Sequence, residues 1–215
     1  VLYKPSEYAT LTGAHLVRLL HEAGVPRDAL ALVVGAGAAG AALLEQPIDG
    51  LFFTGSVATG KRIAAALAER LVKLQLELGG KDPTYVRADA DPKTAAESLA
   101  DGAMYNTGQS CCSVERIYVH AKVYDAFVAA FVKEVQGLKV GEPTDESTYI
   151  GPLTRSQQVK VLQMQVADAL AKGAKLLVGG HALDRPGGHW FEPTVLVNES
   201  RSRTCPCRAR CSRGC

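Results

Sequence analysis

The stretch Leu30-Ala-Leu-Val-Val-Gly-Ala-Gly-Ala-Ala-Gly-Ala-Ala-Leu-Leu44 decides the fold class of this chain. Its apolar beginning, rich in Val and Leu, predicts a buried strand. Gly35, Gly37 and Gly40 then predict a tight turn and the start of a closely packed helix. The uncharged run that contains this stretch has sixteen residues, whereas a membrane helix needs about 20. We therefore interpret it as a strand, a glycine turn and a helix rather than a membrane span.

The alternation of helix and strand patterns extends to both sides of this stretch. Before it, apolar residues recur at helical spacing from Leu16 to Ala23, and Gly24 follows at a position typical of a helix C-terminus. After it, strand patterns at 50–53 and 74–78 flank a helical pattern at 56–71. This order predicts an α/β fold in which helices cover a parallel sheet.

A second α/β segment follows Gly79-Gly80, which we predict to be a domain boundary. Its predicted strands are at 84–86, 116–120, 175–178 and, as one extended segment, 189–196. Its predicted helices are at 92–105, 122–135 and 155–172. The predicted organisation is therefore a first domain at 1–79, a second at 80–197 and a tail at 198–215.

Composition excludes several classes of protein. Apolar residues make up 47% of the 215 residues and charged residues 21%, the balance of a soluble globular protein. The net charge of +2 arises from the tail, since residues 201–215 contain five arginines and no acid. The slightly acidic remainder does not indicate a nucleic-acid surface. No signal peptide follows Val1, and the first 200 residues contain only two cysteines, so we expect a reducing, cytoplasmic compartment.

The glycine string Gly35-x-Gly37-x-x-Gly40 matches a dinucleotide-binding fingerprint, since it follows a strand and opens a helix. The fingerprint also requires an acidic residue about 20 positions later, at the end of a next strand. The next acids here are Glu45 and Asp49. A plain strand-to-helix turn is therefore the favoured interpretation of the string by itself.

The segment Phe53-Thr-Gly-Ser56 is a stronger candidate for contact with a cofactor. A strand is predicted to end at Phe53, Gly55 permits a tight turn, and Ser56 can cap the helix that follows. The free N–H groups at a helix start favour phosphate. An ordinary capped helix explains the segment equally well.

The segment Lys4-Pro-Ser-Glu7 places a cation and a carboxylate beside a rigid proline. A glutamate can accept hydrogen bonds from both hydroxyls of a ribose. Taken alone, the segment is more typical of a surface loop.

Two further motifs hold candidate catalytic residues. Glu77 lies between Leu76 and Leu78 in an apolar strand, and burial there would raise the pKa of its carboxyl group and suit it to be a general base; a solvent-facing glutamate is the alternative. Cys111 and Cys112 lie between a predicted helix and a predicted strand. A cysteine on such a polar turn can be exposed and reactive, while a buried pair would be inert.

Together these motifs resemble the aldehyde dehydrogenase superfamily over about residues 1–197. The resemblance rests on five motifs in the family's order and spacing: Lys4-Pro-Ser-Glu7, Phe53-Thr-Gly-Ser56, Leu76-Glu-Leu-Gly-Gly-Lys81, Gly108-Gln-Ser-Cys111 and Phe191-Glu-Pro-Thr194. It implies a partial Rossmann-like, NAD(P)-binding domain followed by a partial catalytic domain. It also implies a small aldehyde as the substrate, and homo-oligomers among full-length members.

The resemblance assigns roles to individual residues. The family pattern of Gly-Gln, any residue and Cys implies that Cys111 is the nucleophile, with Cys112 as its neighbour, and that Glu77 is the general base. The implied cofactor contacts are at Lys4, Glu7, Gly35, Gly55, Ser56 and Leu78. The implied cofactor is NAD, with NADP as the alternative, since Glu7 would repel a 2′-phosphate.

The implied reaction oxidises an aldehyde to a carboxylic acid through a thiohemiacetal and a thioester on the cysteine. In the family an asparagine in a Pro-Trp-Asn segment holds the oxyanion, and a later glutamate contacts the nicotinamide ribose. Neither motif is found in this sequence, nor are the strands that form the oligomer. We therefore expect the 215-residue chain to be inactive by itself, and a truncated, incompetent family member is the alternative function.

The last eighteen residues, Asn198–Cys215, change abruptly in composition and contain four cysteines. They lack hydrophobic periodicity, so we expect a disordered basic tail of the kind that a shifted reading frame would produce. A metal-binding or redox module built on these cysteines is a weaker alternative. Elsewhere we expect no metal site.

Overall fold

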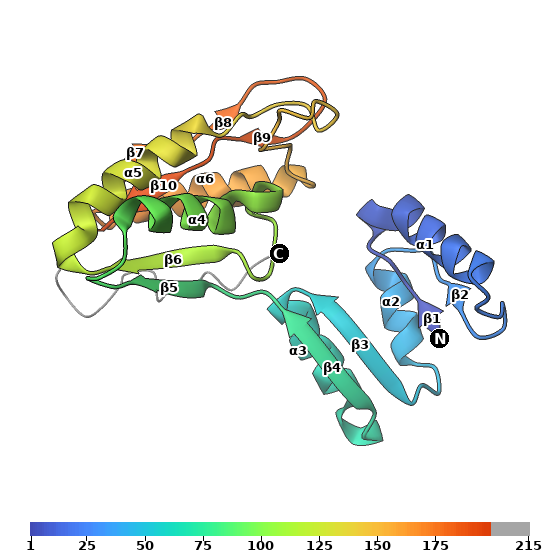
Figure 1. Ribbon diagram of the computed structural model, residues 1–215. Helices are drawn as coiled ribbons and strands as arrows, with labels where there is room; N and C mark the ends of the chain where they lie inside the picture. The colour runs from blue at the N-terminus through green and yellow to red at the C-terminus, as the bar shows by residue number, and fades with distance from the viewer. Residues whose placement is uncertain (199–215) are drawn as a thin grey trace. The chain divides into compact units, whose positions relative to one another are not determined.

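The computed structural model describes residues 1–198 and divides the chain into two compact units (Figure 1). Unit 1 comprises Val1–Thr54 and Thr59–Glu77, and unit 2 comprises Gly55–Ala58 and the chain from Leu78 onward. The change of unit at Leu78 directly precedes the glycine pair at 79 and 80. None of the helices within residues 1–198 is long and apolar enough to cross a membrane.

The first part of the chain alternates helices and strands as predicted. β1 (Leu2–Tyr3) pairs in parallel with β2 (Ala31–Leu32), and η1 (Glu7–Ala9) and α1 (Thr10–Glu22) connect them. The strand–turn–helix interpretation of the opening stretch is confirmed, because α2 (Gly37–Leu44) follows β2. β3 (Gly50–Gly55) is the neighbour of β4 (Lys73–Leu78), and α3 (Val57–Leu67) and η2 (Ala68–Arg70) lie between them in the chain.

Helix α1 does not bury the leucines that define its sequence pattern. Its buried residues are Gly13 and Val17, while Leu16 and Leu19 are each 45% exposed. At the buried face the helix approaches the Pro5 ring closely, since a Cβ atom on Gly13 would lie 2.6 Å from Cγ of Pro5.

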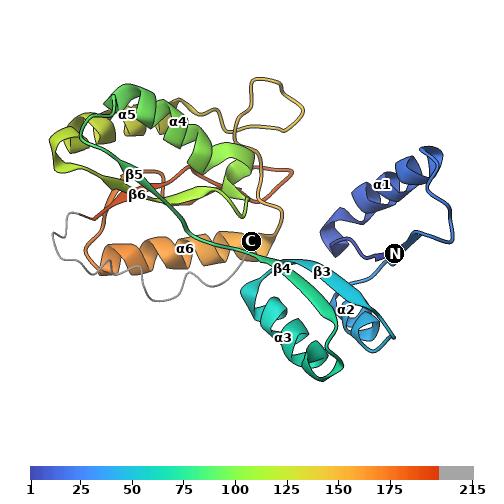
Figure 2. The same cartoon turned by 60° about the horizontal axis from the view of Figure 1, so that its bottom comes forward.

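Unit 2 is built around a parallel strand pair. β5 (Asp82–Val86) and β6 (Val114–Val119) pair in parallel, with α4 (Pro92–Met104) and η3 (Tyr105–Gly108) between them in the chain. η4 (Ala121–Val123) and α5 (Tyr124–Gly137) follow β6. Figure 2 shows the strand pair between α4 and α5 on one side and α6 (Ser156–Ala171) on the other.

The N-terminus of α4 is capped by a side chain of the preceding residue. The carboxylate of Asp91 accepts a hydrogen bond from the Thr94 N–H at 2.8 Å, and Pro92 occupies the first turn. Hydrogen bonding to Thr94 lowers the pKa of this exposed carboxyl group.

The core of unit 2 lies between α4, α5 and the strands. Its buried residues are Val86, Ala96, Ala100, Phe127, Phe131, Val135 and Val195. The rings of Phe127 and Phe131 stack with their centroids 5.5 Å apart. The two residues are about one helical turn apart, so their side chains lie on the same face of α5.

The last part of unit 2 departs from the prediction. β7 (Lys175–Val178) pairs antiparallel with β10 (Val195–Val197), and β8 (Ala182–Leu183), which was not predicted, pairs antiparallel with β9 (Trp190–Phe191). The single extended segment predicted at 189–196 is therefore two strands. Pro193 lies in the break, where its missing N–H cannot continue a strand ladder.

We predict that Phe127→Ala lowers the free energy of unfolding of unit 2 by about 3–5 kcal/mol, because it deletes a buried ring from the core. The chain's single tryptophan, Trp190, is 2% exposed in unit 2, so its fluorescence during urea unfolding reports on this unit. The matched control is Met164→Ala on α6, where the side chain is 63% exposed and the expected change is about 0.5 kcal/mol or less. Equal effects of the two substitutions would contradict the described core.

Candidate active site

Cys111 and Cys112 lie on a turn between η3 and β6, and both are exposed. The backbone before them is unusual, because three successive residues have left-handed φ angles: 51° at Asn106, 61° at Thr107 and 68° at Gly108. Glycine adopts this conformation freely and asparagine tolerates it, but a β-branched threonine rarely does. A strained residue of this kind costs about 1–3 kcal/mol and persists only where its surroundings fix it.

Hydroxyl groups surround the Cys112 sulfur. The phenol oxygen of Tyr105 lies 3.1 Å from Cys112 Sγ, and Ser110 Oγ lies 3.3 Å from it. Tyr105 and Ser110 also hydrogen-bond to each other. Hydrogen bonding by Ser110, then by Tyr105, lowers the pKa of the Cys112 thiol, since these groups stabilise the thiolate.

The end of the glutamate motif is fixed beside this turn. A Cβ atom on Gly80 would lie 3.8 Å from the carbonyl oxygen of Cys111 and 3.0 Å from Asp82 Oδ1. The side chain of Lys81 forms an ion pair with Glu115. The carbonyl oxygen of Lys81 accepts hydrogen bonds of 3.0 and 2.7 Å from the Arg116 guanidinium. Unit 2 therefore brings Gly80, near the end of the glutamate motif, against the turn that carries Cys111 and Cys112. We call this turn, residues 106–113, the thiol turn.

Glu77 is exposed on β4, so the prediction that its side chain is buried is wrong. It accepts a hydrogen bond of 2.6 Å from the side chain of Gln75. Strand alternation explains its exposure, because Lys73, Gln75 and Glu77 share one face of β4. Leu78, the predicted nicotinamide contact, is half-buried at the end of the same strand. Glu77 belongs to unit 1 and Cys111 to unit 2, so their pairing stays a prediction.

Two of the predicted cofactor residues, Lys4 and Gly35, are in contact. Lys4 Nζ donates hydrogen bonds to the carbonyl oxygens of Gly35 at 2.8 Å and Pro5 at 2.7 Å. Gly35 has φ 153°, and a Cβ there would lie 2.6 Å from the Cβ of Ala39. Only glycine fits this turn, and the turn places a cation beside the start of α2.

The remaining predicted cofactor residues lie at the ends of elements. Glu7 is exposed at the first position of η1, which Ser6 caps by accepting the Tyr8 N–H at 3.3 Å. Gly55 ends β3 and Ser56 directly precedes α3, and both are half-buried. This is the strand–turn–helix arrangement predicted for that segment; the cofactor contacts themselves stay predictions.

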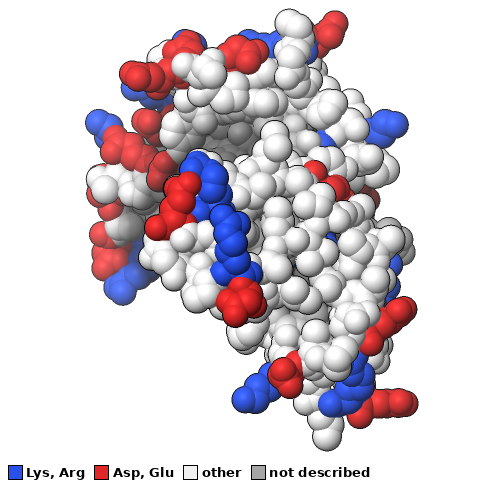
Figure 3. Space-filling model, turned by 90° about the vertical axis from the view of Figure 1, so that its right-hand side faces the viewer, with Lys and Arg blue, Asp and Glu red and all other residues white. Residues whose placement is uncertain are grey.

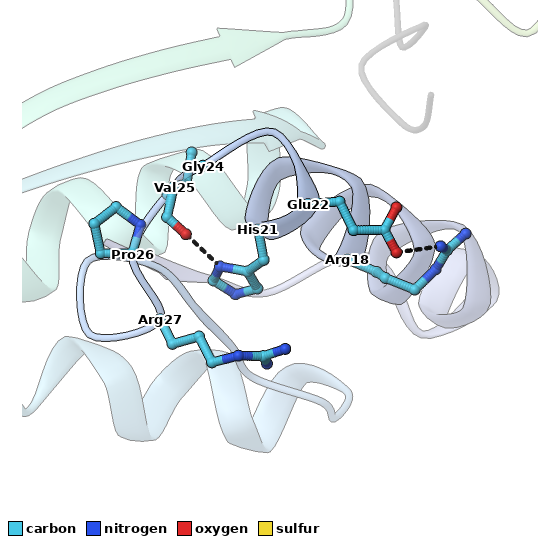
Figure 4. Close-up of a pocket in the computed structure, with 7 residues that line it drawn as sticks. All are labelled: Arg18, His21, Glu22, Gly24, Val25, Pro26 and Arg27. Carbon is cyan, nitrogen blue, oxygen red and sulfur yellow. Dashed lines mark hydrogen bonds and ion pairs between the residues drawn. The ribbon is translucent and has the colours of Figure 1, made fainter.

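A hollow of about 300 Å³ lies elsewhere in unit 1, at the C-terminal end of α1 (Figure 4). Within it, His21 Nδ1 donates to the Val25 carbonyl oxygen at 2.8 Å, and Arg18 pairs with Glu22 at 2.6 Å. No predicted site residue lines this hollow. Several of the polar side chains that line the hollow bond to one another or to the backbone.

Charge and ligand chemistry complete the description of the surface. On the face drawn in Figure 3, cationic and anionic side chains are interspersed around broad uncharged areas. Among residues 1–198, no group of three or more His, Cys, Asp or Glu side chains is placed to hold a metal ion. Except for Asn198, the tail predicted as a disordered segment or a metal module lies outside the described residues.

The aldehyde dehydrogenase family model matches residues 1–208 of the chain. This chain belongs to the aldehyde dehydrogenase family. The family assignment made from the five motifs is therefore confirmed, and so is the predicted α/β fold class.

Relatives within the aldehyde dehydrogenase family are similar over nearly the whole chain. The 3,6-anhydro-alpha-L-galactose dehydrogenase of Vibrio sp. (strain EJY3) is 38% identical over 95% of this chain and 44% of its own length. A putative succinate-semialdehyde dehydrogenase [NADP(+)] of Mycolicibacterium smegmatis is 38% identical over 95% of this chain and 40% of its own. The crystal structure of an NAD-dependent aldehyde dehydrogenase from Sinorhizobium meliloti superimposes with a TM-score of 0.88 and 36% identity, over 91% of this chain and 39% of that one. The chain thus spans less than half the length of these aldehyde dehydrogenases.

Sequence reasoning missed several residues that shape the thiol turn of this family member. Gln109 and Ser110 lie within the cysteine motif quoted above, but the sequence did not indicate which groups their side chains contact. Tyr105 was predicted only as the last residue of a helix, and the left-handed backbone of Thr107 gave no signal in the sequence. Arg116, which binds the Lys81 carbonyl, was predicted only as part of a strand.

We predict that Tyr105→Phe and Ser110→Ala each raise the pKa of Cys112. The two hydroxyls lower the pKa of Cys112 by stabilising its thiolate, so removing either one moves the titration to higher pH, with Ser110→Ala having the larger effect. The measurement is the rate of alkylation of Cys112 by iodoacetamide as a function of pH, read by peptide mass spectrometry. Tyr85→Phe, at an exposed tyrosine of β5, is the control. A midpoint that stays the same in both variants would rule out the hydroxyl effect.

Proposed function

We propose that this chain provides the nucleophile and the general base for the oxidation of an aldehyde to a carboxylic acid with NAD(P)+. The observation that supports this most directly is the exposed Cys111 on a turn with a constrained backbone, beside Gly80 of the glutamate motif. An exposed thiol at the end of a helix–strand connection is accessible to a small carbonyl compound. The Cys-Glu motif pair and the names of the relatives support the reaction class.

The proposed chemistry forms and breaks one bond at Cys111. Its sulfur bonds to the carbonyl carbon of the aldehyde, giving a thiohemiacetal. A dinucleotide held by the cofactor residues named below would accept the hydride that leaves this carbon, the hydroxyl proton would pass to solvent, and the substrate would remain as a thioester on Cys111. Glu77 then takes a proton from water, the resulting hydroxide attacks the thioester, and the carbon–sulfur bond breaks to release the carboxylic acid.

Residues near the starts of α2 and α3 support the binding of a dinucleotide. Lys4 Nζ is held at the Gly35 turn, whose backbone excludes a side chain, so a cation lies beside the start of α2. Ser56 directly precedes α3, and the N–H groups at a helix start attract phosphate. In this proposal Lys4 and Glu7 hold the adenosine ribose, Gly35 lies near the adenosine, Gly55 and Ser56 bind the pyrophosphate, and Leu78 approaches the nicotinamide. The carboxylate of Glu7 favours NAD over NADP.

The second candidate function is that of a family member that does not complete turnover by itself. The observation behind it is that the chain spans 44% or less of the relatives described above. A cytoplasmic location, which was expected from cysteine usage, is part of the first proposal, whereas homo-oligomers were expected of full-length family members only. The experiments below separate the two candidates.

If the wild-type chain forms NADH from propanal and NAD+, we predict that Cys111→Ala abolishes this turnover, because it removes the only group proposed to bond to the substrate. Cys112→Ala, the matched control on the next residue, is expected to retain turnover. The measurement is NADH absorbance with the 215-residue chain. Turnover that depends on Cys112 instead would contradict the assignment, and a wild-type chain without turnover would favour the second candidate.

We predict that Glu77→Gln slows deacylation rather than acylation, since the carboxylate is proposed to act only on water. The test needs no cofactor: p-nitrophenyl acetate acylates the thiol, and the acetyl group on Cys111 is followed by mass spectrometry. Loss of a general base typically costs about 10²–10⁴-fold, so the acetylated form should accumulate in Glu77→Gln and decay in wild type. Gln75→Ala, which removes the hydrogen-bond donor to Glu77, is the control. Equal decay in wild type and Glu77→Gln would exclude this role.

A further inference from the structure

The turn that carries Cys111 is hydrogen-bonded to a segment more than forty residues away in the chain. We call this segment, Gly151–Thr154, the clamp segment. The hydroxyl of Thr107 accepts a hydrogen bond from the Gly151 N–H at 3.1 Å and donates one to the Gly151 carbonyl oxygen at 3.3 Å. The side-chain oxygen of Gln109 accepts from the N–H of Thr154 at 3.0 Å and from its hydroxyl at 3.1 Å.

The clamp segment is anchored in the core at Ile150 and Leu153. Ile150, directly before it, is 2% exposed, and Leu153, within it, is 5% exposed. The Ile150 N–H donates to the Lys139 carbonyl oxygen at 3.0 Å, and the Leu153 N–H donates to the His189 carbonyl oxygen at 2.7 Å. The segment therefore has little freedom to follow a moving turn.

The residues of the thiol turn, in contrast, do not all favour the backbone conformation that they adopt. Asn106, Thr107 and Gly108 are all left-handed, and Thr107 is the β-branched member. Such a conformation persists where surrounding contacts determine it. Thr107, the most strained residue of the turn, is also the residue that makes two of the contacts with the clamp segment.

We propose that the clamp segment, acting through Thr107 and Gln109, positions the thiol turn so that Cys111 points consistently toward the substrate. The inference rests on the proposed role of Cys111 as nucleophile. Thr154 is then a positioning residue, since it touches Gln109 and none of the reacting atoms. Rates of bond formation are sensitive to small displacements of the nucleophile, so a loosened turn lowers kcat while the substrate still binds.

The experiment compares Thr154→Val with Thr154→Ser. Valine keeps the shape of threonine but removes the hydroxyl that donates to Gln109, whereas serine retains it. A second variant, Gln109→Leu, removes the acceptor of both hydrogen bonds. The first readout is hydrogen–deuterium exchange of the amides in residues 106–113, and the second is kcat and KM for propanal with NAD+.

We expect exchange in residues 106–113 to accelerate about fivefold in Thr154→Val, the ratio that corresponds to one ordinary hydrogen bond, and more in Gln109→Leu. Thr154→Ser should match wild type, and all three variants should keep the wild-type melting temperature. Where turnover is measured, kcat should fall by a similar factor with KM unchanged.

Unchanged exchange in both Thr154→Val and Gln109→Leu overturns the proposal. Acceleration spread over the whole of unit 2 also overturns it, since the contacts would then support the fold rather than the turn. An unchanged kcat despite faster exchange in residues 106–113 would also overturn the proposal. Exchange needs no turnover, so a wild-type chain that fails to oxidise propanal refutes the proposed function while the exchange comparison still decides the clamp.

Discussion

The arrangement of the thiol turn depends on the parallel register of β5 and β6. Asp82 pairs with Val114 at the start of the two strands. In a parallel pair the residues that precede both strands meet at the same edge, so this register brings Gly80 to the carbonyl oxygen of Cys111. A parallel pair also needs a crossover, and α4 supplies it, which leaves η3 and the turn to return the chain to the sheet. The glutamate motif and the cysteine motif, about thirty residues apart in the chain, become neighbours because β5 and β6 pair in parallel.

The features that follow from local chemistry could be predicted from the sequence. Asp91-Pro92 marked the start of α4 because capping and proline at the first turn are properties of a few adjacent residues. The glycine turn after β2 was visible for the same reason. The exposure of Glu77 was also within reach, since Lys73 and Gln75 share its face; the adjacent glycines and the expectation of a buried base outweighed this alternation.

Contacts between distant segments could not be predicted from one sequence. The hydroxyl of Thr107 meets Gly151 forty-four residues later, and no spacing rule connects the two. The packing of α1 through Gly13 likewise depends on where the Pro5 ring lies, a property of the fold rather than of the helix. The split of the segment at 189–196 was partly readable at Pro193, but the pairing of β9 with the unpredicted β8 was not.

The two adjacent thiols are distinguished by different kinds of evidence. The family pattern selects Cys111, while the hydroxyls of Tyr105 and Ser110 lower the pKa of Cys112. These findings are compatible, because a thiol with a lower pKa forms more thiolate but is intrinsically a weaker nucleophile. Cys111 also hydrogen-bonds to Cys112 and contributes to lowering its pKa. Tyr105 and Ser110 therefore stabilise negative charge on the residue next to the proposed nucleophile, so a lowered pKa by itself does not identify the catalytic thiol.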